Sequence, residues 1–103
     1  MSIFAQVEGV YNSTRELRSI SKALYKTGRK LDRLKEHINN NRNKLARSRE
    51  QVPPPRLLRE RQSLLEDYQR KAEKFGKLTK DYTDQMVKIN AHLREAHKAF
   101  QKN

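Results

Sequence analysis

The sequence predicts an all-α protein, a long antiparallel two-helix hairpin (a coiled coil) whose turn lies at residues 51–55. Three observations predict this fold: a proline triplet near the middle of the chain, a seven-residue repeat on each side of it, and a composition of strong helix formers. No window alternates apolar and polar residues in the way that indicates a strand. With 103 residues, the chain is long enough for a single domain.

Upstream of the prolines, every seventh residue is aliphatic. These heptad a residues are Ile3, Val10, Leu17, Leu24, Leu31, Ile38 and Leu45. The matching d residues mix aliphatic with small or polar side chains: Ser13, Ile20, Thr27, Leu34, Asn41 and Ser48. A capping box formed by Ser13 and Glu16 places the start of the first helix near residue 13. We therefore expect helix 1 over residues 13–50, after a partly helical segment at 1–12.

Downstream, a second heptad series predicts helix 2 over residues 56–101. Its expected a residues are Leu58, Leu65, Ala72, Thr79, Met86, Leu93 and Phe100. Its expected d residues are Arg61, Tyr68, Phe75, Tyr82, Ile89 and Ala96. Two series of this length are typical of helices that pack along a shared seam.

The proline triplet is interpreted as the tip of the hairpin. Proline is tolerated in the first turn of a helix, and it disfavours helix in the residue before it. Folding the chain about Pro53 pairs Leu31 with Phe75 and Leu24 with Tyr82, which gives well-matched layers. The same pattern also fits two copies that exchange arms, so a closed hairpin and an arm-swapped dimer both remain open.

Several apolar residues fall outside the expected seam and are candidate partner-binding residues. They are Phe4, Tyr11 and Tyr25 on helix 1, and Leu57, Leu64 and Leu78 on helix 2. A two-helix hairpin buries only part of so broad an apolar surface. We therefore expect further helices from another helical protein or from a second copy, giving a dimer or four-helix bundle. Gly28 and Gly76 mark a flexible midpoint, a close approach of another helix, or simply two tolerated glycines.

The net charge of +12 predicts attraction to an acidic surface. Between residues 22 and 49, ten Lys or Arg side chains are opposed by Asp32 and Glu36 alone. The basic stripe is defined by five of them: Lys22, Lys26, Arg29, Lys30 and Arg33. Such a stripe fits a nucleic-acid backbone, an acidic protein surface, or a solvated helix face. No base-reading motif accompanies it.

The sequence gives little basis for catalysis or cofactor binding. There is no cysteine, and His92 and His97 are five residues apart, unlike the i, i+4 pair of a helical metal site. No phosphate loop is present, the apolar runs are too short for a membrane span, and no signal-like segment opens the chain. We expect a non-enzymatic, intracellular interaction protein that binds no metal and no cofactor. It would act as an adaptor, a chaperone-like partner or a small subunit of a larger assembly; the alternative is a nucleic-acid-binding helical dimer.

Overall fold

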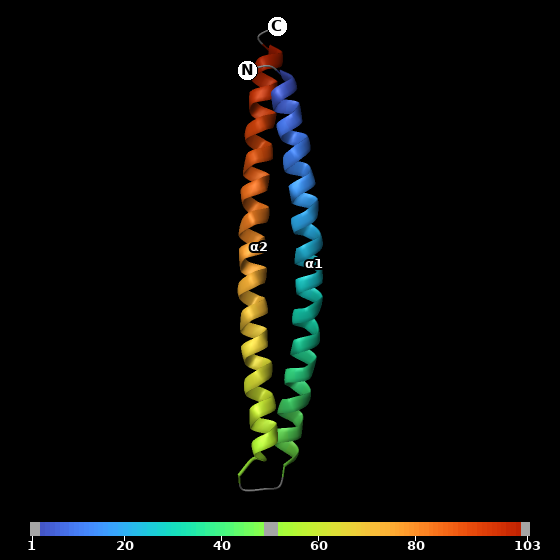
Figure 1. Cartoon of the computed structure of the whole chain (residues 1–103), viewed down its shortest axis with the longest axis vertical. Coiled ribbons are helices and arrows are strands. Elements are labelled where there is room, and N and C mark those ends of the chain that lie inside the picture. The colour runs from blue at the N-terminus through green and yellow to red at the C-terminus, as the bar shows by residue number, and fades with distance from the viewer. Residues whose placement is uncertain (1–2, 49–51, 102–103) are drawn as a thin grey trace. The chain divides into compact units, whose positions relative to one another are not determined.

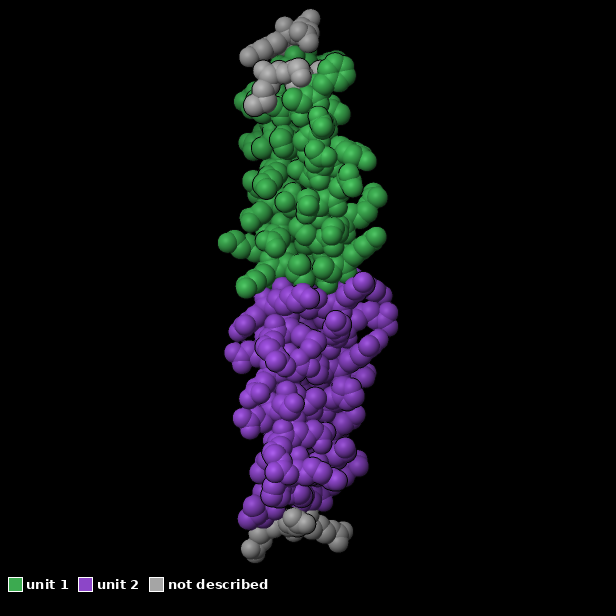
Figure 2. Space-filling view, in the orientation of Figure 1, with its two compact units in different colours: residues 1–24, 77–103 green, residues 25–76 purple. Residues whose placement is uncertain are grey.

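The computed structural model describes residues 3–48 and 52–101, and it confirms the predicted fold class. Helix α1 (Ile3–Arg47) and helix α2 (Pro55–Gln101) form an antiparallel hairpin (Figure 1), and no strand occurs in the described residues. The chain divides into two compact units (Figure 2). Unit 1 comprises Met1–Leu24 with Lys77–Asn103, and unit 2 is Tyr25–Gly76. In each unit a segment of α1 lies beside a segment of α2.

The helix ends near the tip follow from local chemistry. Helix α1 ends at Arg47, where the Ser48 N–H donates to the Leu45 carbonyl at 3.3 Å. Helix α2 begins at Pro55, where a missing N–H costs nothing. The Pro54 carbonyl accepts the first bonds of α2, from the N–H groups of Leu57 (3.0 Å) and Leu58 (3.3 Å). Of the predicted turn, Gln51 lies outside the described residues, Val52 to Pro54 are non-helical, and Pro55 already belongs to α2.

The start of α1 differs from the sequence-based expectation. The helix begins at Ile3 and continues through residue 13, so Ser13 does not cap it. Ser13 is instead buried within unit 1, where a small side chain suits a close approach of the two helices. The heptad pattern that already extended to Ile3 was therefore a better guide than the capping-box motif.

The two helices pack through four heptad tracks, each named here by its first member. On α1 the predicted tracks form the seam. The Gln6 track (6, 13, 20, 27, 34, 41 and 48) is the deeper one, and the Val10 track (10, 17, 24, 31, 38 and 45) is half-buried. On α2 the predicted Arg61 track (61, 68, 75, 82, 89 and 96) also faces α1, with Phe75 its most exposed member.

The second seam track of α2 corrects the sequence-based assignment. The buried or half-buried residues belong to the Leu57 track (57, 64, 71, 78, 85, 92 and 99). The Leu58 track (58, 65, 72, 79, 86, 93 and 100) was expected in the seam, yet all of its members are exposed. The physical reason is that the apolar face of α2 is broader than one neighbouring helix can cover.

The buried track of α2 is the more polar of its two candidate tracks. The Gln6 track carries Gln6, Ser13, Thr27 and Asn41, all buried, and these side chains need polar or small neighbours. The Leu57 track offers His92, Gln85 and Lys71, whereas the Leu58 track has no side chain more polar than Thr79. The hairpin thus places its more polar tracks in its own seam.

Observed contacts also correct the predicted register. Tyr82 and Leu17 line one surface hollow in unit 1, although Tyr82 was expected beside Leu24. In unit 2, a Cβ placed on Gly28 would lie 3.7 Å from the Phe75 ring, which was expected beside Leu31. Relative to the prediction, α2 is shifted by about one helical turn. The shift is consistent with the helix ends: α1 ends at Arg47 and α2 begins at Pro55, so the midpoint of the connection in sequence is residue 51 and not Pro53.

Candidate partner-binding face

The Leu58 track forms an exposed apolar surface along α2. Its large members include Leu58 and Leu65, each 43% exposed, then Met86, Leu93 at 51% and Phe100 at 72%. The two remaining members, Ala72 and Thr79, are small and also exposed. Large exposed apolar side chains at a constant heptad spacing are typical of a surface that packs against another helix.

The same side of α2 lacks charged residues. The next track outward is exposed and consists of Gln62, Gln69, Gly76, Thr83, Asn90 and His97. No Asp, Glu, Lys or Arg occurs on it or on the Leu58 track. The track on the opposite side of the seam is entirely charged: Glu60, Asp67, Lys74, Asp81, Lys88 and Glu95. Helix α2 therefore has one uncharged side and one charged side.

On α1, the corresponding residues belong to the Val7 track (7, 14, 21, 28, 35 and 42). The Val7 track follows the Gln6 track by one residue, as the Leu58 track follows the Leu57 track, so both occupy the heptad e position of the observed seam. In an antiparallel pair, the e positions of the two helices lie on the same side of the pair. The Val7 track therefore borders the same side of the hairpin as the Leu58 track. Its first four members are Val7, Thr14, Ser21 and Gly28, and its last two are Lys35 and Arg42.

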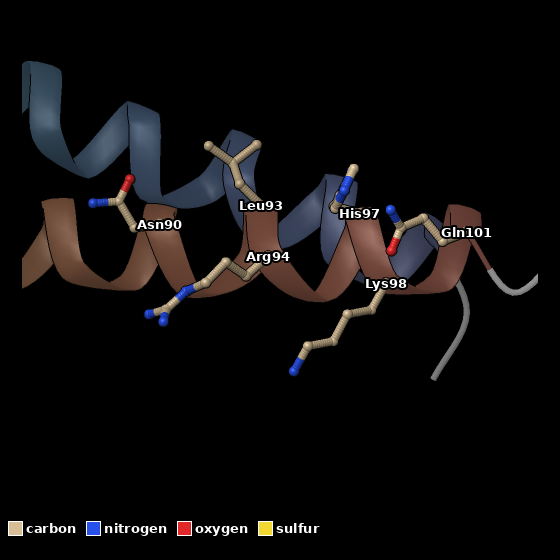
Figure 3. Close-up of a pocket in the computed structure, with 6 residues that line it drawn as sticks. All are labelled: Asn90, Leu93, Arg94, His97, Lys98 and Gln101. Atoms are coloured by element: carbon tan, nitrogen blue, oxygen red, sulfur yellow. The ribbon is translucent and has the colours of Figure 1, made fainter.

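In unit 1, this side of the hairpin is mainly apolar. Phe4 (81% exposed), Val7 and Tyr11 contribute from α1, and Met86, Leu93 and Phe100 contribute from α2. Figure 3 shows Leu93 and His97 extending from one side of α2, and Arg94 and Lys98 from the other. A shallow hollow lies on the same side and is lined by Thr14, Leu17, Ser21 and Tyr82, and Arg18 and Lys22 line it as well. Small α1 residues thus leave room for side chains of an added helix.

In unit 2, the same side is divided between apolar and basic residues. Leu58 and Leu65 come from α2, and Lys35 and Arg42 come from the Val7 track of α1. The four side chains are exposed. Gly76 lies farther along α2, eleven residues after Leu65, and a Cβ placed there would meet nothing within 4 Å.

The structure separates the predicted partner-binding residues into two groups. Phe4, Tyr11 and Tyr25 are exposed, as expected. Arginines lie over two of these rings: the Arg15 and Arg29 guanidinium carbons are 5.9 and 5.7 Å from the Tyr11 and Tyr25 ring centroids. Such cation–π contacts help to fix the two tyrosines on the surface.

The other three residues were placed wrongly by the sequence. Leu57 is buried at 6% exposure, and Leu64 and Leu78 are half-buried, so all three belong to the hairpin's own seam. The surface residues that the sequence missed are the large members of the Leu58 track. The polar side chains of the Gln6 track were the signal that favoured burying the Leu57 track instead.

The basic stripe is exposed throughout its length. Within the described residues, Lys22, Lys26, Lys30 and Arg33 form no ion pair, while Arg29 donates to the Tyr25 hydroxyl at 3.4 Å. The ion pairs observed lie within α2: Asp67 contacts Lys71, and also Arg70 at 3.5 Å, and Glu95 contacts Lys98 at 3.5 Å. The hydrogen bond from Lys71 holds the pKa of Asp67 below its ordinary value, and the charges of Lys71 and Arg70 act in the same direction.

Two polar contacts cross the seam. In unit 2, the fully buried Asn41 donates from Nδ2 to the Leu57 carbonyl at 3.0 Å, and its Oδ1 accepts no bond from the described residues. In unit 1, His92 Nδ1 lies 2.9 Å from Gln6 Oε1. Because an amide oxygen only accepts, this contact is a hydrogen bond in the tautomer that carries the proton on Nδ1. The His92 ring rests on Gly9, where an added Cβ would come within 2.6 Å of it.

The described residues contain no group of three or more His, Cys, Asp or Glu side chains arranged to hold a metal ion. Neither α1 nor α2, as described, has a stretch apolar and long enough to cross a bilayer. No protein-family model, curated protein or solved structure matches the chain. The candidate site therefore rests on the chain's own geometry.

Proposed function

We propose that this protein is a non-enzymatic interaction protein that works by packing helices of a partner onto the side of the hairpin that carries the Leu58 track. One observation carries the proposal: the hairpin buries its more polar α2 track and leaves the more apolar track exposed. A hairpin stabilised only by its own contacts would favour the opposite choice, because burying apolar area is the main source of stability.

The seam supports this proposal by its small apolar content. In the described residues, the buried apolar side chains are Leu34 and Leu57, whereas Gln6, Ser13, Thr27 and Asn41 are buried polar ones. A chain of this size normally needs a larger core or an added partner for stable folding. The protein would then serve as an adaptor, a chaperone-like partner or a small subunit of a larger assembly.

The test compares neighbouring positions on α2. Met86→Gln and Leu93→Gln together alter the Leu58 track, and Val87→Gln alters an exposed apolar residue outside it. We expect the tagged chain to retain a stoichiometric helical protein from its source cells, the double variant to lose it, and the Val87 variant to keep it. A purified chain that is a stable, fully helical monomer with no partner would contradict the proposal. Equal retention by both variants would contradict it as well.

A second candidate function is nucleic-acid binding through the basic stripe. The supporting observation is that its lysines and Arg33 are exposed and make no ion pair within the described residues. Phosphate binding by four cations would fall steeply with salt, because each contact releases counterions. We expect Lys22→Glu, Lys26→Glu, Arg29→Glu and Arg33→Glu together to abolish retention on a nucleic-acid column. Unchanged retention would eliminate this candidate.

A further inference from the structure

We propose that unit 2 binds an acidic amphipathic helix, whose apolar side chains contact Leu58 and Leu65 and whose carboxylates face Lys35 and Arg42. This inference rests on the proposed function and specifies the chemistry of the partner. It concerns unit 2 alone, where exposed apolar and exposed basic residues occur on the same side of the hairpin.

The spacing of the four residues fits a helix lying along the hairpin. Leu58 and Leu65 are seven residues apart, and so are Lys35 and Arg42. Seven residues advance a helix by about 10.5 Å, so the two rows have the same pitch. In a partner helix with a heptad repeat, the apolar residues recur every seven residues, and so do the residues that flank them. One such helix therefore meets both rows at once.

The chain itself forms no ion pair with the two cations on this side of unit 2, Lys35 and Arg42, within the described residues. The α2 carboxylates nearest the seam in this unit, Glu60 and Asp67, lie on the opposite side, and Asp67 is engaged by Lys71 and Arg70. Two carboxylates flank this side: Asp32 is on the heptad track of Phe4 and Tyr11, and Glu66 accepts a hydrogen bond from Gln62 of the outward track at 3.3 Å. Glutamate or aspartate side chains from a partner would complement the two cations.

Charge also favours an acidic partner over a second copy of the chain. Each copy carries +12, so self-association through this side would bring two strongly basic molecules together. Opposite charge would speed the association of an acidic helix with this side and would make the bound complex more specific. Self-association is therefore treated as an outcome of the test rather than as the proposal.

The probes are two synthetic peptides of about four heptads, long enough for a bound helix. Both have Leu at the a and d positions. One has Glu at every e and g position, and the other has Lys there. Like charges at e and g keep each peptide from pairing with itself, so binding appears as a rise in helical circular dichroism and in the anisotropy of a peptide label. We expect the full chain to bind the Glu peptide and not the Lys peptide.

Charge reversal provides the decisive variant. Lys35→Glu with Arg42→Glu should weaken binding of the Glu peptide about tenfold at low salt, because two attractions become repulsions. The same variant should now accept the Lys peptide. The matched control is Lys44→Glu with Lys74→Glu, which makes an equal change of charge at exposed positions of unit 2 on the opposite side of the hairpin. This control should bind the Glu peptide nearly as the unaltered chain does.

Several results would overturn the inference. They are equal binding of both peptides, no binding of either, an equal loss in the control variant, or stronger binding to phosphatidylglycerol vesicles than to the Glu peptide. A concentration-dependent dimer that Leu58→Gln with Leu65→Gln dissociates would assign this side to a second copy. Loss of the cellular partner in the Met86 and Leu93 variant, without any effect of charge reversal, would retain the proposed function while rejecting an acidic helix on unit 2.

Discussion

The two compact units differ in what they bury. In unit 2, the described residues bury two leucines, Leu34 and Leu57, together with Thr27 and Asn41. In unit 1, the buried side chains described are Gln6 and Ser13, both polar. Unit 1 also exposes seven large apolar residues: Phe4, Val7, Tyr11, Met86, Val87, Leu93 and Phe100.

The contrast is between a unit that buries apolar side chains in its seam and a unit whose apolar seam residues are only half-buried. Unit 2 has an apolar seam and is also closed at the tip by the chain connection. The seam of unit 1 also contains apolar residues, among them Val10, Leu17 and Ile89, but these are only half-buried. We therefore expect amide hydrogens of unit 2 to exchange more slowly than those of unit 1 in the isolated chain.

The largest expected effect comes from two adjacent leucines in unit 2. Leu57→Ala should lower the free energy of unfolding by about 2–4 kcal/mol, because it empties a buried site. Leu58→Ala should cost less than about 1 kcal/mol, since that side chain is 43% exposed. Urea denaturation followed by circular dichroism measures both. Equal losses would show that α2 is rotated away from the orientation in which Leu57 faces α1 and Leu58 faces outward.

Asn41→Leu should make unit 2 more stable relative to unit 1. The amide is fully buried and its Oδ1 accepts no bond from the described residues, so an apolar replacement removes a desolvation cost. We expect a gain of about 1–2 kcal/mol in unfolding free energy. Because a buried Asn helps to fix the alignment of paired helices, hydrogen exchange near the tip should become less uniform. A loss of stability would contradict this account of the amide.

Two glycines test whether the units differ in local crowding. Gly76→Ala should stabilise unit 2 by about 0.5–1 kcal/mol, since the added methyl meets nothing and alanine favours helix. Gly9→Ala should bring no net gain, because its methyl displaces the His92 ring and breaks a bond worth about 1 kcal/mol. Thermal melts compare the two variants. The helix gain should reappear in Gly9→Ala when His92→Ala is also present; its continued absence would rule out the clash.

The smallest expected effect is on the stability of the folded chain at acidic pH. The pKa of Asp67 is lower in the folded chain than its ordinary value, so its contribution to stability is present at neutral pH and is lost as pH falls below about 4. Asp67→Asn should therefore reduce the fall in stability over that range. Urea midpoints between neutral and acid pH measure the difference. Asp84→Asn, at an exposed carboxylate with no ion pair among the described residues, is the control. Identical acid profiles for the two variants would refute the assignment.

The sequence predicted the fold class and a helix on each side of the proline triplet, although α1 begins at Ile3 and the predicted register about Pro53 was wrong. Heptad spacing and proline chemistry are local signals, and local signals were sufficient for these features. The choice between Leu57 and Leu58 as the seam track was not local. Both tracks are apolar enough to be buried against α1. Which of them is buried depends on which one better accommodates Gln6, Thr27 and Asn41 on the other helix. For the same reason, Phe4, Tyr11 and Tyr25 were recognised as exposed while Leu57, Leu64 and Leu78 were misplaced.

The contact between His92 and Gly9 also makes the His92 ring a natural NMR probe of helix pairing in unit 1. Of the three histidines, His37 and His97 are exposed, whereas His92 rests on the backbone of the opposite helix. Its ring protons therefore lie in an environment that exists only while the two helices of unit 1 are paired. Their NMR resonances would report opening and closing of this half of the molecule without any added label. A titration with a partner could then follow, at one atom, whether binding orders the half that the chain itself packs least.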